Sequence, residues 1–208
     1  MAGEKMSIID SIIKFFQRIK YHILLSFIIF VSFAVLGYLY PSVFQHLVQP
    51  VLNNMHQGVE NGTVKLETMP LFINNFSVAL NMIVGCFTLS VSTIYLLIYN
   101  ALLVGYTGIF LPLQYYLSMT LPHGIFELTA IILAGASSFR LTQAILVFLL
   151  RLLNNDENSK PMKEHLKVSI YMAVDAILLI GLIMILLIIA AFIEANVTIP
   201  FTQLIFRI

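Results

Sequence analysis

The residues with the clearest chemical potential are His123 and Glu127, which are four positions apart. Side chains at this spacing share one face of a helix, so an imidazole would lie beside a carboxylate. Such a pair can supply two metal ligands, or an acid and a base. Three more polar residues, Asn74, Asn75 and Glu194, lie near the ends of other apolar stretches. If these stretches cross a membrane, we expect all five side chains at a similar depth, in a polar cluster near its outer face.

A second group of ionisable residues lies deeper in the apolar stretches. Asp175 is eight residues beyond Lys167, about 12 Å along a helix, and Arg140 is eleven residues before Arg151, about 16 Å. An isolated charge near the centre of a bilayer costs at least ~2.5–3.5 kcal/mol, whereas a paired charge is tolerated. We therefore predict an ion pair between Arg140 and Asp175 whose role is mainly structural.

Complete catalytic motifs are absent from the sequence. Neither H-E-x-x-H nor G-x-S-x-G occurs, and the single cysteine, Cys86, follows Gly85 in an apolar stretch, where an inert buried thiol is expected. A metal at His123 and Glu127 would need a third ligand from Glu194 or Asn74. We therefore predict no metal, no cofactor and no enzymatic activity.

Composition identifies the class of protein. Of the 208 residues, 60% are hydrophobic and 10% are charged, and the mean hydropathy is +0.95. Soluble domains carry roughly 45–50% apolar and about 25% charged residues, so this chain is predicted to be an all-α polytopic membrane protein in one domain. The formal net charge of +1 provides no field that would attract a nucleic acid.

Apolar runs and charges divide the chain into elements. We predict about five transmembrane helices, an N-terminal amphipathic helix on the inner leaflet, an outer loop at 41–70 and a cytoplasmic loop at 151–167. The amphipathic helix is predicted at 6–21, and the spans are predicted at 23–40, 72–93, 97–114, 123–150 and 168–194.

Three local features set these boundaries. The 44 uncharged residues from Leu71 to Gln114 would extend ~66 Å as one helix, so we expect a reversal near Thr93–Asn100. Pro122 is expected to open the fourth span as a first-turn proline. The small residues around Gly135 permit either close helix contact or a break in that span.

Positively charged residues indicate the orientation. They concentrate before the first span and around the loop before the last span: Lys5, Lys14, Arg18 and Lys20, then Arg151, Lys160, Lys163 and Lys167. The positive-inside rule assigns both segments to the cytoplasm, which requires an even number of crossings between them. Five spans in a cell membrane, with the N-terminus inside and the C-terminus outside, satisfy this requirement.

Three sequence motifs lie between Leu71 and Pro200: L-P-H-G-I-F-E-L at 121–128, F-I-N-N at 72–75 and A-F-I-E-A-N-V-T at 191–198. In their order and spacing they resemble the stage II sporulation protein M-like family of integral membrane proteins. The resemblance implies about five spans and a role for His123, Glu127 and Glu194 that it does not name. The member that gives the family its name works as a membrane anchor for peptidoglycan-degrading partners.

Three functions are compatible with these features. The first is a non-enzymatic scaffold or assembly factor for membrane or cell-envelope proteins, which the family analogy favours; the small and polar residues of the spans favour a homo-oligomer in the lipid bilayer. The second is a transporter or channel that uses the carboxylates of Glu127 and Glu194, which predicts a water-filled cavity at Glu127. The third and weakest is an intramembrane hydrolase with His123 and Glu127 as base and acid.

Overall fold

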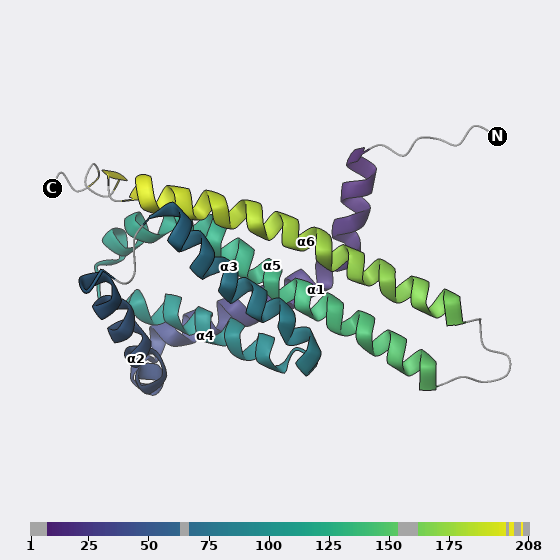
Figure 1. The fold of residues 1–208 in the computed structure, drawn as a ribbon. Helices are drawn as coiled ribbons and strands as arrows, with labels where there is room; N and C mark the ends of the chain where they lie inside the picture. The colour runs from purple at the N-terminus through teal and green to yellow at the C-terminus, as the bar shows by residue number, and fades with distance from the viewer. Residues whose placement is uncertain (1–7, 63–66, 154–161, 199, 202–204, 206–208) are drawn as a thin grey trace.

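The computed structural model describes residues 8–62, 67–153, 162–198, 200–201 and 205. Within these residues the chain is a bundle of α-helices without strands (Figure 1). Its elements are α1 (Ile8–Leu39), α2 (Pro41–Glu60), α3 (Thr68–Val84), a short 3-10 helix (Gly85–Thr88), α4 (Val91–Thr107), α5 (Leu113–Leu153) and α6 (Met162–Asn196).

The lengths and compositions of the helices identify a membrane protein. Four segments are long and apolar enough to cross a bilayer: Ile8–Leu39, Thr68–Thr88, Leu113–Leu153 and Leu166–Asn196. A shorter apolar helix, Val91–Thr107, accompanies them. The predicted all-α polytopic membrane protein is confirmed.

The helix α1 joins two segments that were predicted to be separate, 6–21 and 23–40. It is one continuous helix of 32 residues, because no glycine or proline separates Tyr21 from Ile23 and because Ile19 is fully buried in the core rather than lying on the leaflet surface. Residues 6 and 7 lie outside the described part of the chain. In Figure 1 the first turns of α1 stand apart from the bundle.

The predicted outer loop at 41–70 is largely helical. The helix α2 begins at Pro41, which suits a first helical turn. Its residue Val48 is fully buried and packs with Leu102 and Tyr106 of α4, and the Tyr106 hydroxyl donates a hydrogen bond to Gln49 Oε1 (2.8 Å). The apolar face of α2 therefore covers α4, while residues 63–66 of the predicted loop lie outside the described part.

The chain reverses direction between α3 and α4 earlier than predicted. The turn lies at Gly85–Ser90 instead of Thr93–Asn100, which is inside α4. Leu89 and Ser90 both adopt the left-handed conformation, with φ of 51° and 65°, a conformation that glycine adopts at lower cost. Hydroxyl groups stabilise the turn, since Thr88 Oγ1 donates to the Gly85 carbonyl (2.9 Å) and Thr93 Oγ1 to the Met82 carbonyl (2.7 Å). The turn thus combines Gly85, where a Cβ would collide with the Thr93 hydroxyl, with hydrogen bonds of hydroxyl groups that stabilise its two left-handed residues.

Glycines permit close contact between α1, α4 and α5. A Cβ at Gly105 would collide with the Ala34 carbonyl oxygen, and a Cβ at Gly135 would collide with the Ser26 hydroxyl. That hydroxyl donates a hydrogen bond to the Ile132 carbonyl (2.7 Å). Gly135 is therefore a site of close helix contact within an unbroken α5, and no break occurs there.

The helices α5 and α6 form a long antiparallel pair (Figure 1). The 41 residues of α5 begin at Leu113, so Pro122 lies inside the helix and does not open it. The helix starts earlier because the Pro112 carbonyl accepts the backbone N–H groups of Tyr115 and Tyr116. The Tyr116 hydroxyl then donates to the Val104 carbonyl of α4 (2.8 Å), which ties the first turns of α5 to the bundle. These contacts anchor the part of α5 that precedes Pro122, so the proline falls inside the helix.

Candidate functional site

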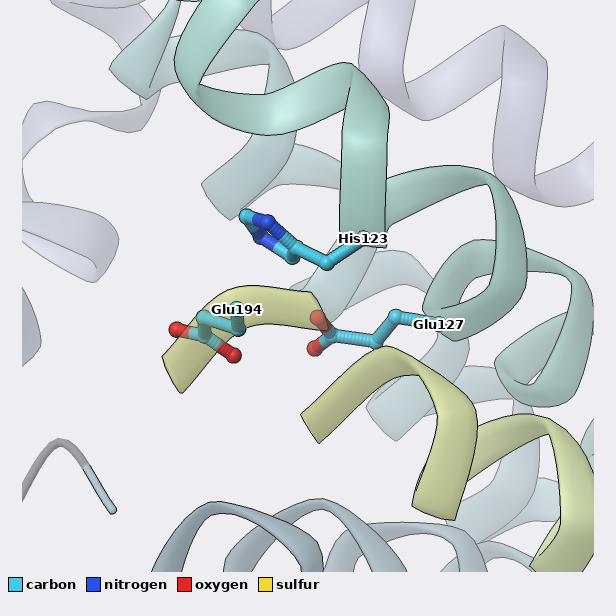
Figure 2. Close-up of side chains that lie close together, drawn as sticks. All are labelled: His123, Glu127 and Glu194. Atoms are coloured by element: carbon cyan, nitrogen blue, oxygen red, sulfur yellow. The ribbon is translucent and has the colours of Figure 1, made fainter. Parts of the chain in front are cut away.

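The structure brings together three of the residues singled out in the sequence. His123 and Glu127 occupy one face of α5, and Glu194 lies two residues before the end of α6. One ligand atom of each side chain, a ring nitrogen or a carboxylate oxygen, lies within 4.8 Å of the others. Figure 2 shows the three side chains in the space between the two helices. We call His123, Glu127 and Glu194 the outer cluster.

Local sequence and helix pairing both position the outer cluster. The four-residue spacing of His123 and Glu127 stacks them on α5. The antiparallel pairing of α6 with α5 carries Glu194 to the same level, and the end of α6 is attached to α3, where Asn196 Nδ2 donates to Thr68 Oγ1 (3.3 Å). Residues about 70 positions apart therefore form one site.

The His123 ring is oriented by the segment that follows α6. Its Nδ1 lies 3.2 Å from Thr198 Oγ1, and the Thr198 hydroxyl lies within hydrogen-bonding distance of the Ile193 carbonyl (3.3 Å). A His123 ring protonated at Nδ1 would donate to the Thr198 oxygen while the Thr198 hydroxyl donates to the Ile193 carbonyl. That tautomer would leave Nε2 unprotonated and available as a ligand or an acceptor. Sequence analysis missed Thr198, which belongs to the A-N-V-T segment but lies beyond the predicted span.

The two carboxylates of the outer cluster lack protein partners in the described part of the chain. Neither Glu127 nor Glu194 takes part in a hydrogen bond or ion pair there, although both are only partly exposed. Two like charges close together in a shielded position repel each other. The site is therefore suited to a group that supplies positive charge or protons.

A pocket of about 560 Å³ opens beside the outer cluster. His123 and Glu127 line it together with Asn74 and Asn75 of α3 and with further polar side chains from α4 and α5: Tyr99, Asn100, Thr107, Tyr116 and Thr120. Asn74 Nδ2 donates to Asn75 Oδ1 (3.2 Å), and neither asparagine hydrogen-bonds to the outer cluster among the described residues. Of the five residues of the predicted polar site, three thus form the outer cluster, and the two asparagines line the pocket beside it.

Apolar side chains fill the bundle core next to the pocket. On α5, Ile131 lines it, and the next turns of that helix are buried and small or apolar. Fully or almost fully buried residues of four helices fill this level: Ala79, Met82, Leu97, Ala130, Ala134, Ile183 and Leu187. The pocket therefore ends within the membrane-spanning bundle.

Deeper in the bundle, Asp175 makes ion pairs with two arginines. Its Oδ2 lies 2.7 Å from Arg140 Nη2, and its Oδ1 lies 2.6 Å from Arg18 Nη2. Arg140 also donates to Gln143 Oε1 (2.7 Å), while its Nε has no partner among the described residues. The Asp175 and Arg140 side chains are 3% and 9% exposed, and Arg18 is 50% exposed. We call Arg18, Arg140 and Asp175 the inner cluster.

Sequence analysis identified two members of the inner cluster and missed Arg18. That residue was placed with the basic residues of a surface helix, because it lies on the polar face of the first turns of α1. Because α1 is one continuous helix, the Arg18 guanidinium reaches Asp175 of α6. In the sequence, the position of Arg18 shortly before the predicted first span was the one indication of this contact.

A family model described as Stage II sporulation protein M matches residues 26–199. The chain is also similar to an uncharacterized protein of Methanocaldococcus jannaschii, with 32% identity over 138 residues that cover 62% of this chain and 68% of the relative. No solved structure matches the chain. The matched region contains the outer cluster, Arg140 and Asp175.

Proposed function

Because the chain belongs to the stage II sporulation protein M family, we propose that it is a non-enzymatic membrane scaffold or assembly factor. It would hold membrane or cell-envelope proteins, associate with copies of itself, and keep its N-terminus in the cytoplasm and its C-terminus outside. The positive-inside distribution of Lys and Arg supports this orientation.

One observation carries the proposal: the α5–α6 pair extends past the helices that cover it. The α3–α4 turn contacts α5 at Thr142, whose Oγ1 lies 2.6 Å from Ser90 Oγ. The helix α5 continues for eleven more residues to Leu153, which is about 16 Å. Figure 1 shows this end of the pair projecting beyond the turn between α3 and α4.

The projecting part of α5 carries a leucine stripe: Leu146, Leu149, Leu150 and Leu153. These four side chains are 39%, 47%, 58% and 81% exposed. Their spacing of three, one and three residues places them on one face and is typical of helices that pack against another helix. A partner helix fits this surface.

Site-specific photo-crosslinking in cells that naturally make the protein tests the scaffold. We expect a crosslinker at Leu150 to give discrete products that contain a second protein species. A crosslinker at Ile185, an equally exposed apolar position of α6, is the matched control and should give none. The substitution Leu149→Arg should remove the Leu150 product while the protein stays in the membrane and remains monodisperse after extraction.

Two outcomes would contradict the scaffold. Equal labelling at Leu150 and Ile185 would identify the leucine stripe as an ordinary lipid-facing surface. A product that contains only this chain would support self-association and argue against assembly with partners.

A transporter is the second candidate, and the pocket beside Glu127 favours it. The polar side chains in its lining and the unpaired carboxylates resemble a site for a cation or a small polar solute. On α5 the lining extends no further than Ile131, so transport would require a path through the apolar core beyond it. Purified protein in liposomes should then carry protons, cations or solutes down an imposed gradient, and Glu127→Gln should abolish the flux, whereas Glu67→Gln should not. Flux equal to that of empty liposomes under every gradient would exclude this candidate.

A further inference from the structure

We propose that the outer cluster binds one divalent cation of the zinc class, with His123, Glu127 and Glu194 as its three protein ligands. This inference goes beyond the scaffold function and does not depend on it. It rests on the donor atoms, on their geometry, on the orientation of the His123 ring and on the charge of the site.

The donor set fits a borderline divalent ion. One imidazole nitrogen and two carboxylate oxygens are ligands that Zn²⁺ accepts at about 2.0–2.2 Å. Ca²⁺ and Mg²⁺ prefer sites made of oxygen atoms alone. The single cysteine is a buried residue of the short 3-10 helix and is not part of the cluster. The site therefore favours zinc over the alkaline-earth ions, without a sulfur ligand.

The distances are close to those of a metal site. The three ligand atoms lie within 4.8 Å of one another, and the ligands of a tetrahedral zinc ion are about 3.4 Å apart. Rotations of the Glu127 and Glu194 side chains can close this difference, because neither carboxylate is held by a hydrogen bond or an ion pair among the described residues.

The contact between His123 and Thr198 provides the support that metal-bound histidines typically have. A histidine ligand usually donates its other ring N–H to an oxygen atom, which fixes the tautomer and the ring orientation. Here Nδ1 faces the buried Thr198 hydroxyl at 3.2 Å, and Nε2 is left as the metal-binding nitrogen. Thr198 is therefore a positioning residue of the proposed site.

The charge of the site also calls for a cation. Two carboxylates with a neutral imidazole carry a charge of −2 when ionised, and no lysine or arginine pairs with them in the described part of the chain. A bound Zn²⁺ would neutralise the site, which lowers the cost of its carboxylates at membrane depth. It would also link α5 to the end of α6. The fourth coordination position would face the pocket, where water can complete the coordination.

Zinc titration of the purified protein in lipid nanodiscs tests this inference. The protein is stripped with EDTA, dialysed and titrated with ZnCl₂, and bound metal is measured by elemental analysis together with the thermal unfolding midpoint. We expect one zinc ion per chain and a rise in the midpoint, since a ligand that binds the folded state stabilises it. Mn²⁺ should bind more weakly, and Ca²⁺ and Mg²⁺ should not compete.

Variants locate the ion. We expect His123→Gln, Glu127→Gln and Glu194→Gln each to weaken zinc binding by at least about 100-fold, because loss of second-shell partners alone typically costs 10–100-fold. Thr198→Val should weaken it by about 10–100-fold. The matched controls are His46→Gln and Glu67→Gln, which change an exposed imidazole and an exposed carboxylate away from the cluster and should leave zinc binding unchanged.

Three results would overturn the proposal. One is a wild-type protein that binds no zinc in this titration. Another is a variant of the outer cluster that remains monodisperse and binds zinc as the wild type does. The third is effective competition by Ca²⁺ or Mg²⁺. X-ray absorption of the zinc-loaded protein provides a readout independent of the variants, and sulfur in the first shell would equally contradict the assignment.

Discussion

The inner and outer clusters both place ionisable side chains in α5 and α6, and the inner cluster adds Arg18 of α1. The two clusters differ in the partners that these side chains have. In the inner cluster, Asp175 is held between two arginines at 2.6 and 2.7 Å. In the outer cluster, Glu127 and Glu194 lie near each other without a cationic side chain among the described residues, beside a pocket of about 560 Å³. The inner cluster is completed by the chain itself, whereas the outer cluster is left open to a ligand.

This difference separates a structural role from a binding role. Buried ion pairs between side chains of one chain join the helices that carry them. Here the ion pairs of Asp175 join α1, α5 and α6. Unpaired carboxylates at membrane depth are retained at a cost in stability, which is typical of functional sites. Four variants test the contrast: three remove a carboxylate, and one removes a cationic partner of Asp175.

The largest effect is expected from Asp175→Ala. This change leaves Arg140 buried without its counter-ion, and breaking a buried pair typically costs about 3–5 kcal/mol. Equilibrium unfolding in mixed detergent micelles should show a loss of this size. The matched control is Asp10→Ala, at an exposed position in the first turn of α1, which should change the free energy of unfolding by less than about 0.5 kcal/mol. A similar small loss for Asp175→Ala would contradict the structural role.

The double substitution Arg140→Leu with Asp175→Leu should be far less damaging than Asp175→Ala. Replacing both members of a buried pair by apolar residues is often neutral, because no unpaired charge remains. Arg18 is left without its partner, but it is half exposed and can reach water. We expect at least half of the lost free energy to return. A double variant as unstable as Asp175→Ala would show that the pair contributes more than mutual neutralisation.

Removal of Arg18 should have a moderate effect. Arg18→Ala deletes one of two partners of Asp175 and leaves the neutralisation by the more buried Arg140 in place. Because the Arg18 side chain is half exposed, its ion pair is screened by solvent, and we expect a loss of about 1 kcal/mol in the same unfolding measurement. A loss as large as that of Asp175→Ala would make Arg18, and not Arg140, the main counter-ion.

The smallest effect is expected at the outer cluster in the absence of metal. Glu127→Gln removes a carboxylate that has no protein partner and lies near Glu194, so the free energy of unfolding in EDTA should change by less than about 1 kcal/mol. The inner and outer carboxylates would then differ several-fold in their contribution to stability. A loss of more than about 2 kcal/mol would place Glu127 in the same structural category as Asp175.

Local patterns in the sequence were sufficient to predict the class of the protein, the shared face of His123 and Glu127, and the ion pair between Arg140 and Asp175. The apolar runs predict a helical membrane protein because a bilayer demands long uncharged helices. The four-residue spacing of His123 and Glu127 predicts their shared face, since helical geometry depends on the local chain alone. The distances of Arg140 and Asp175 from the basic ends of their helices predicted that the two residues lie at a similar depth. In the structure Arg140 Nη2 lies 2.7 Å from Asp175 Oδ2.

Other features depend on contacts between distant segments and left weak local signals. In the turn between α3 and α4, Leu89 and Ser90 adopt positive φ where glycine would be expected, because hydroxyl groups of the neighbouring helices stabilise the turn. Pro122 stays inside α5 because contacts with α4 extend that helix to Leu113. Arg18 reaches Asp175 only through the continuity of α1, and Thr198 reaches His123 only through the pairing of α5 with α6. The spacing of residues in the sequence determines which side chains share a face of a helix. Which helix packs against that face depends on tertiary contacts between residues far apart in the chain.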